Sequence, residues 1–163
     1  GPELEAMLET ELAELQRKHP QGFLVRLHIL GDFYSVGYVA KWAKWLGQFP
    51  ALHVYGYTAN QPDAADDTER AIGQALLSLL ENCGARWAVR FSGNFDRATM
   101  TANSADDSRA MDAVEAKQAF LCPTQISKAT GKYAAKGEET LVPDCGACGL
   151  CWSASKPVVF ITH

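Results

Sequence analysis

Three short runs of branched and aromatic residues, separated by amphipathic stretches, constrain the fold of this chain more than any other feature. The runs are GFLVRLHIL from residue 22, ALHVYGYT from residue 51 and ARWAVRFS from residue 85. Apolar residues recur at helical spacing in 3–18, 35–48 and 65–84. Alternating strands and helices with short links predict crossover units, which lay the strands parallel and place the helices outside. The expected fold class is α/β, with a parallel-type sheet or a partial (β/α) barrel and a C-terminal cysteine-rich metal-binding segment.

Length and composition favour one domain with its own core. The chain has 163 residues, of which 47% are hydrophobic, so it can bury a core without a metal to hold it together. We expect a single domain over 1–163, with crossover units over 3–93 and a cysteine-ligated metal segment over 118–163. A net charge of -4 does not indicate broad binding of nucleic acid. No apolar run approaches the roughly 20 residues that span a bilayer, so no membrane partner is expected.

The cysteines carry the clearest chemical signal. Five cysteines, an odd number, favour reduced thiols and a cytoplasmic location over a disulfide framework. Cys145, Cys148 and Cys151 lie three residues apart on a glycine-rich turn, which lets three sulfurs converge on one point. Cys122, at the end of a predicted strand, is the candidate fourth ligand, and His163 could replace one thiolate unless it is merely solvated. This spacing predicts a metal site.

The grouping of the ligands bears on which metal they would hold. Zinc sites made of four cysteines usually bring two separated CxxC pairs. Here the grouping is three plus one, which resembles the cysteine run and remote Cys-Pro of bacterial-type ferredoxins, because a cube spreads its ligands further than one ion does. The match is imperfect, since the remote cysteine of those ferredoxins ligates the other cluster of a pair. A [4Fe-4S] cluster is the preferred expectation and Zn2+ the alternative.

Polar residues on the predicted strands form a second group. Arg26 and His28 alternate on one side of the first strand, and Asp32 follows its end. These three are the candidate catalytic residues, with His28 as the proton shuttle. The candidate residues for binding a small or anionic substrate lie on the next two strands: His53, Tyr57, Arg90 and Ser92. Alternatively, the same side chains satisfy one another's hydrogen bonds inside the protein.

Several segments resemble a known family. RLHILGDFYSVGYVAKWAKWL, HVYGYTA, AFLCPTQ and CGACGLCW with KPVVFITH look, in this order, like the phage and bacterial gene product 88 domain family, from about residue 22 to the end. The resemblance implies a cysteine-bound metal at Cys122, Cys145, Cys148 and Cys151, and a polar GDF strand end at Gly31–Phe33. It implies no particular activity.

The same family offers a more distant resemblance. Some members carry a further cysteine cluster ahead of the first helix, similar to that of radical S-adenosylmethionine enzymes, whose partial barrels also alternate strand and helix. The likeness is one of fold alone. Because this chain has no cysteine before Cys83, we do not expect it to cleave S-adenosylmethionine.

Two functions follow as hypotheses. The first is the metal-binding domain of a phage-related metalloenzyme, in which a cluster with four protein ligands is structural or relays electrons beside an Arg/His/Asp crevice. The alternative is a non-catalytic module in which zinc staples the C-terminal segment. The contacts to a protein or nucleic acid would then come from Trp152, Tyr133 and a basic loop that contains Lys128, Lys132 and Lys136. That loop can equally be an ordinary solvated one.

Overall fold

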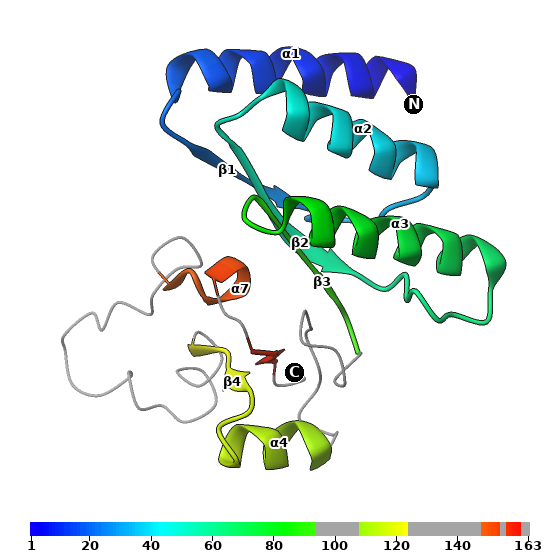
Figure 1. Cartoon of the computed structure of the whole chain (residues 1–163), viewed down its shortest axis with the longest axis vertical. Coiled ribbons are helices and arrows are strands. Elements are labelled where there is room, and N and C mark those ends of the chain that lie inside the picture. The colour runs from blue at the N-terminus through cyan, green and yellow to red at the C-terminus, as the bar shows by residue number, and fades with distance from the viewer. Residues whose placement is uncertain (94–107, 124–147, 154–155, 161–163) are drawn as a thin grey trace. The chain divides into compact units, whose positions relative to one another are not determined.

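The computed structural model describes residues 1–93, 108–123, 148–153 and 156–160, and Figure 1 shows their secondary structure. The chain divides into two compact units, Gly1–Val89 and Arg90–His163. The single domain over 1–163 stays a prediction.

The first unit alternates helices and strands, as the sequence predicts. The helices are α1 (Pro2–Lys18), α2 (Val36–Gln48) and α3 (Asp67–Cys83), and the strands are β1 (Phe23–Leu27), β2 (Leu52–Thr58) and β3 (Trp87–Phe91), whose last residues belong to the second unit. They form a sheet with the order β1-β2-β3, in which β1 pairs with β2 in parallel. The α/β class and the parallel pairing are confirmed. Within the described residues the three strands form a small sheet that does not close into a barrel, and the partial barrel stays a prediction.

The two crossover helices begin at side-chain caps. The Ser35 hydroxyl accepts a hydrogen bond from the Tyr38 amide at 3.1 Å and starts α2. Asp66 Oδ1 accepts from the amides of Thr68 and Glu69, both at 2.9 Å, and starts α3. Such caps satisfy amides that the first helical turn leaves without a partner. Since β1, β2 and β3 are neighbours in chain order, right-handed connections place α2 and α3 on the same face of the sheet, as Figure 1 shows.

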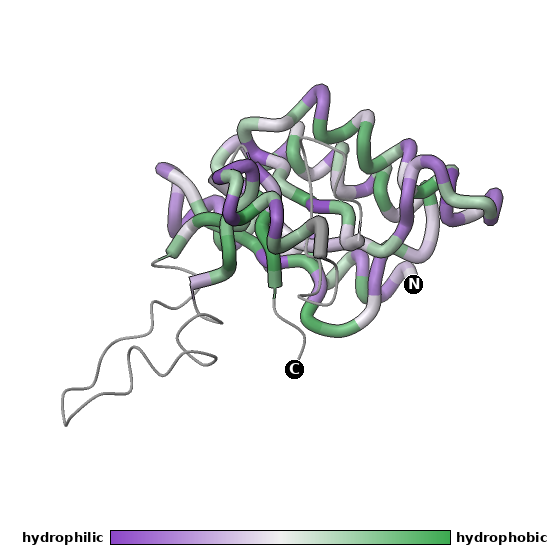
Figure 2. Tube along the Cα trace, turned by 90° about the horizontal axis from the view of Figure 1, so that it is seen from below, coloured by the Kyte–Doolittle hydropathy of each residue, from purple (hydrophilic) through white to green (hydrophobic). Residues whose placement is uncertain are grey.

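The core of the first unit lies between these helices and the sheet. Figure 2 shows hydrophobic and hydrophilic residues alternating along the helices, so each turns one face inward. The almost fully buried side chains are Trp42, Trp45, Leu46, Leu52, Val54, Leu76, Trp87 and Val89. By contrast, α1 buries only Leu12 and leaves Leu4 52% and Met7 62% exposed. The apolar face of α1 is therefore only partly covered.

The second unit is smaller in its described part. It contains α4 (Ser108–Glu115), β4 (Phe120–Leu121), α7 (Leu150–Ser153) and β5 (Val158–Val159). β4 pairs with β5 in parallel, through Phe120–Val158 and Leu121–Val159. One hydrophobic cluster of its described part contains Ala110, Ala113, Ala119 and Val159. Within the described ranges, every helix is too short or too polar to cross a bilayer.

Candidate functional site

The predicted GDF strand end forms a turn that is fastened to the end of β2. Asp32 Oδ1 accepts a hydrogen bond from the Phe33 amide at 2.7 Å, and Asp32 Oδ2 accepts from the Ala59 amide at 2.6 Å. Since both carboxylate oxygens bind main-chain amides, Asp32 joins the turn after β1 to the residue that follows β2.

A buried asparagine completes this fastening. Asn60 Nδ2 donates to the Phe33 carbonyl oxygen and to the Thr58 hydroxyl, each at 3.1 Å. Thr58 is 1% exposed and Asn60 8% exposed, so both act inside the protein. The sequence analysis did not single out Asn60. Its place two residues after Thr58, at the end of a predicted strand, is the signal that would have found it.

His28 lies one residue beyond the end of β1. Its ring meets the Phe33 ring edge-on with the centroids 4.7 Å apart, and its Nε2 lies 3.3 Å from the Tyr38 hydroxyl. Its buried Nδ1 has no hydrogen-bond partner among the described residues. Burial lowers the pKa of His28, and the negative charge of Asp32 opposes this effect. His28 is therefore neutral at pH 7 and keeps one ring nitrogen for another partner.

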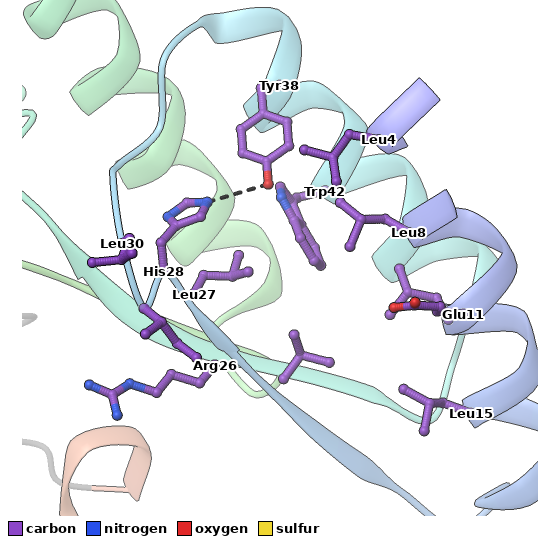
Figure 3. Close-up of a pocket in the computed structure, with 13 residues that line it drawn as sticks. Leu4, Leu8, Glu11, Leu15, Arg26, Leu27, His28, Leu30, Tyr38 and Trp42 are labelled. Atoms are coloured by element: carbon purple, nitrogen blue, oxygen red, sulfur yellow. Dashed lines mark hydrogen bonds between the residues drawn. The ribbon is translucent and has the colours of Figure 1, made fainter. Parts of the chain in front are cut away.

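Arg26 and His28 do not share a side of β1. Figure 3 shows the guanidinium of Arg26 and the imidazole of His28 pointing in opposite directions from the strand. Arg26 is exposed and stands beside Tyr55 in the strand register. The three candidate catalytic residues thus separate into a neighbouring pair, His28 and Asp32, and an arginine that points elsewhere.

A cavity of about 420 Å³ opens next to His28, between α1, β1 and α2. Most of its wall is aliphatic, and the His28–Tyr38 hydrogen bond lies at one end (Figure 3). The Glu11 carboxylate points toward it from α1. The lining residues are Leu4, Leu8, Glu11, Leu12, Leu15, Val25, Arg26, Leu27, His28, Ile29, Leu30, Tyr38 and Trp42. The sequence analysis did not identify Tyr38 as part of a site; its polar hydroxyl on an otherwise apolar helix face was the available signal.

The predicted substrate-binding residues lie on different elements. His53, near the start of β2, is half-buried, and its Nδ1 lies 3.1 Å from the Ala51 carbonyl oxygen. Tyr57, near the end of β2, is half-buried, and Ser92 lies in the turn after β3. Tyr57 thus lies near the carboxyl end of β2 and Ser92 follows the carboxyl end of β3, whereas His53 lies near the amino end of β2.

Arg90 is 4% exposed and binds main-chain oxygens of the second unit. Its Nε donates to the Cys151 carbonyl oxygen at 2.6 Å. Its Nη1 and Nη2 donate to the carbonyl oxygens of Lys156, at 3.2 Å, and Leu150, at 3.4 Å. The guanidinium thus holds the segment that carries Cys151.

Three of the four predicted metal ligands lie in the described residues. Cys122 is buried directly after β4, and Cys148 and Cys151 are half-buried on either side of the start of α7. None of these three cysteines forms a disulfide bond. No three histidine, cysteine, aspartate or glutamate side chains group as a metal site within the described ranges. The fourth ligand, Cys145, lies outside those ranges, as do His163, Tyr133 and the basic loop with Lys128, Lys132 and Lys136.

A glycine shapes the turn between the two described cysteines of this segment. Gly149 has φ of +67°, a left-handed conformation that other residues adopt reluctantly. A Cβ at this position would lie 3.6 Å from the Trp152 ring. The CGLCW sequence therefore has a glycine where the backbone turns between Cys148 and Cys151.

The comparisons with known proteins agree on one family. A family model described as Gene product 88 matches residues 2–154. The Gene 88 proteins of Mycobacterium phage D29 and Mycobacterium phage L5 are 26% and 27% identical to this chain over 147 residues. Each match covers 90% of this chain but 57% of the relative, so the chain spans little more than half the length of these curated relatives. No solved structure matches, and none of these matches supports the resemblance to radical S-adenosylmethionine enzymes.

Proposed function

Since the chain belongs to the Gene product 88 family, we propose that this family member binds a metal centre through Cys122, Cys145, Cys148 and Cys151. A [4Fe-4S] cluster is preferred over Zn2+ because the ligands group as three plus one. The observation that carries the proposal is that none of the three described cysteines of the second unit is in a disulfide bond, and that two of them, Cys148 and Cys151, flank the turn at Gly149. Thiolates are the ligands that zinc and iron–sulfur clusters favour.

The proposal requires the cysteine segment to close around its metal. Small metal sites commonly assemble only when the metal binds, because the binding free energy contributes to folding. With four protein ligands, the bound group would supply structural support or electron relay. The thiols would stay reduced in the cytoplasm, which is where we expect the chain to act.

Metal analysis of cysteine variants tests this proposal. We expect the full chain, purified without oxygen, to contain iron and acid-labile sulfide, or else one zinc ion. Replacing Cys122, Cys145, Cys148 or Cys151 by serine should each lower that content. Cys83→Ser is the matched control, because Cys83 lies at the end of α3 in the other unit. A metal-free wild-type chain, even after anaerobic reconstitution, would contradict the proposal.

The cavity beside His28 supports a second function, the binding of a small molecule. An aliphatic wall that ends in a neutral imidazole and a hydroxyl suits a ligand with an apolar body and one hydrogen-bonding group. An anionic substrate is less well matched, since His28 is neutral and the Arg26 guanidinium points away from it. The imidazole of His28 makes it the candidate general base or acid.

Ligand screening by isothermal titration calorimetry tests the second function, because the heat of binding does not depend on the tryptophans that the variants add. Leu8→Trp should fill the cavity and abolish binding, whereas His28→Gln should weaken binding of ligands that have the polar group. As a control, Leu77→Trp alters α3, outside the cavity lining. Equal binding by wild type and Leu8→Trp would exclude this cavity as the site.

The non-catalytic alternative depends on the basic loop. Binding to an oligonucleotide should weaken steeply with salt and disappear when Lys128, Lys132 and Lys136 are replaced by glutamine. Binding that is unaffected by salt and by replacement of the three lysines would exclude the loop as a nucleic-acid contact.

A further inference from the structure

We propose that Arg90 is a positioning residue for the cysteine turn and fixes the main chain that carries Cys148 and Cys151. As a statement about metal affinity, this inference rests on the metal-binding function proposed above. As a statement about the turn, it stands on the hydrogen bonds of Arg90 alone.

The guanidinium binds the turn from a distant part of the sequence. It donates to the carbonyl oxygens of Leu150, Cys151 and Lys156, which lie 60, 61 and 66 residues further along the chain. The shortest of these bonds, 2.6 Å, is made to the oxygen of Cys151 itself. A planar guanidinium offers its donors in a fixed fork, so three bonds define both the position and the orientation of the bound segment.

The length of α7 explains why this support matters. A helix leaves its last carbonyl oxygens without intrahelical partners, and α7 spans only Leu150–Ser153. The amides of Trp152 and Ser153 reach the Gly149 carbonyl oxygen at 3.3 and 3.0 Å, which ties down the start of the turn. Arg90 binds the carbonyl oxygens that follow. Arg90 therefore holds carbonyl oxygens that these bonds to Gly149 leave unbound.

This use of Arg90 differs from the substrate-binding role expected from the sequence. Three donors of its nearly buried side chain already bind main-chain oxygens, so they do not bind a substrate. Groups that orient a metal ligand from outside the ligand set typically change metal affinity by about 10- to 100-fold when they are replaced.

The chain provides a matched control. Arg86 also binds main-chain oxygens, since its Nη1 donates to the carbonyl oxygens of Phe49 at 3.2 Å and Leu52 at 3.3 Å. All three residues belong to the first unit. Replacing Arg86 therefore removes two bonds of the same kind, far along the chain from the cysteines of the second unit. Because the Arg86 amide donates to the Cys83 carbonyl oxygen, the Cys151 rate of this variant is compared directly with that of wild type and not with Cys83.

The experiment compares full-length wild type with Arg90→Met, Arg90→Lys and Arg86→Met. In the metal-free chains, the alkylation rate of Cys151 by iodoacetamide is measured by mass spectrometry, with Cys83 as internal reference. In the loaded chains, Zn2+ affinity is measured by chelator competition and the ligand geometry by the absorption spectrum of bound Co2+.

We expect Arg90→Met to change the Cys151 rate several-fold relative to Cys83, to weaken Zn2+ binding at least about tenfold and to alter the Co2+ spectrum. The alkylation rate and Zn2+ affinity of Arg90→Lys should lie between those of wild type and Arg90→Met, because an ammonium keeps the positive charge but not the fork of donors. Arg86→Met should lower the melting temperature without these effects.

The outcomes separate the two proposals. If wild type takes up no metal but Arg90→Met still changes the Cys151 rate, the metal proposal fails and the role of Arg90 in the turn stands. If Arg90→Met and Arg90→Lys both match wild type in alkylation and affinity, the positioning role is overturned. If Arg90→Met does not fold, the folded Arg90→Lys variant decides by the same criteria.

Discussion

At the scale of single residues, Asp32 and His28 differ in what they leave available. Both oxygens of Asp32 bind main-chain amides, so its carboxylate serves the turn. His28 has one ring nitrogen near Tyr38 and the other buried without a partner among the described residues. A buried polar atom without a hydrogen bond costs free energy, about 1–3 kcal/mol, unless a ligand supplies it. Of the two, His28 is the better candidate for contact with a ligand.

The lowered pKa of His28 predicts a pH-dependent stability. In the unfolded chain His28 takes up its proton near the ordinary pKa of about 6.5, whereas burial lowers the pKa in the folded chain. The free energy of unfolding should therefore be highest above about pH 6.5 and fall as the pH decreases through the folded-state pKa. Urea denaturation from about pH 8 to about pH 5 measures this.

His28→Gln should flatten that fall, and His19→Gln, a change at an exposed residue, should leave it as in wild type. Equal pH profiles for wild type and His28→Gln would contradict the prediction.

Asp32→Ala should destabilise the first unit by about 2 kcal/mol, because two amides lose a charged acceptor, one of them in an exposed bond. Asp66→Ala removes a similar pair of bonds at the start of α3 and should cost about 1 kcal/mol. Both costs are measured by chemical denaturation. Only Asp32→Ala should shift the NMR signals of Asn60, which the same turn binds. A stability of Asp32→Ala equal to that of wild type would show that the turn holds without the carboxylate.

At the scale of elements, the close pairing of β1 and β2 depends on one small residue. Gly56 is buried and stands opposite Leu27 in the register. A Cβ at Gly56 would overlap the carbonyl oxygen of Leu27. Since that contact is with main chain, it cannot be relieved by turning a side chain. Glycine therefore permits the strand end that carries His28 to lie against β2.

Gly56→Ala should cost about 3 kcal/mol or more, because the strands must move apart. Gly47→Ala is the matched control, since a Cβ there meets nothing within 4 Å and the residue lies in α2. It should stabilise the chain by about 0.5–1 kcal/mol, the usual gain in helix propensity. Thermal unfolding measures both, and a Gly56→Ala chain as stable as wild type would refute the argument from the close contact.

At the scale of the whole molecule, the two units differ in what stabilises them. The first has three buried tryptophans, Trp42, Trp45 and Trp87. One hydrophobic cluster of the second contains mainly small side chains: Ala110, Ala113, Ala119 and Val159. Small side chains bury little apolar area and so contribute little stabilisation. A bound metal would supply what this cluster lacks.

Adding metal should therefore protect the second unit selectively. We expect Zn2+, or reconstitution with iron and sulfide, to slow amide hydrogen exchange in residues 108–123 and 148–160, with residues 1–89 unchanged. Mass spectrometry of peptides from each unit measures the effect, with Cys148→Ser as the control. Equal protection in both units, or protection in neither, would contradict the prediction that the metal stabilises the second unit alone.

The sequence by itself determined the order and type of the elements in the first unit. The strand runs and helical stripes are local patterns, and their alternation fixed the α/β class and parallel pairing. The caps at Ser35 and Asp66 are equally local, since each side chain binds amides within three residues of itself.

Only the tertiary structure decided where the side chains of the site point. The side chain of His28 does not follow the alternating pattern of β1, because the strand ends at Leu27 and the His28 ring packs on Phe33 and Tyr38. The side chain of Arg90 donates hydrogen bonds to carbonyl oxygens 60 or more residues away in the sequence. Periodicity records the face of an element on which a residue lies, whereas these contacts depend on which distant backbone comes within hydrogen-bond reach.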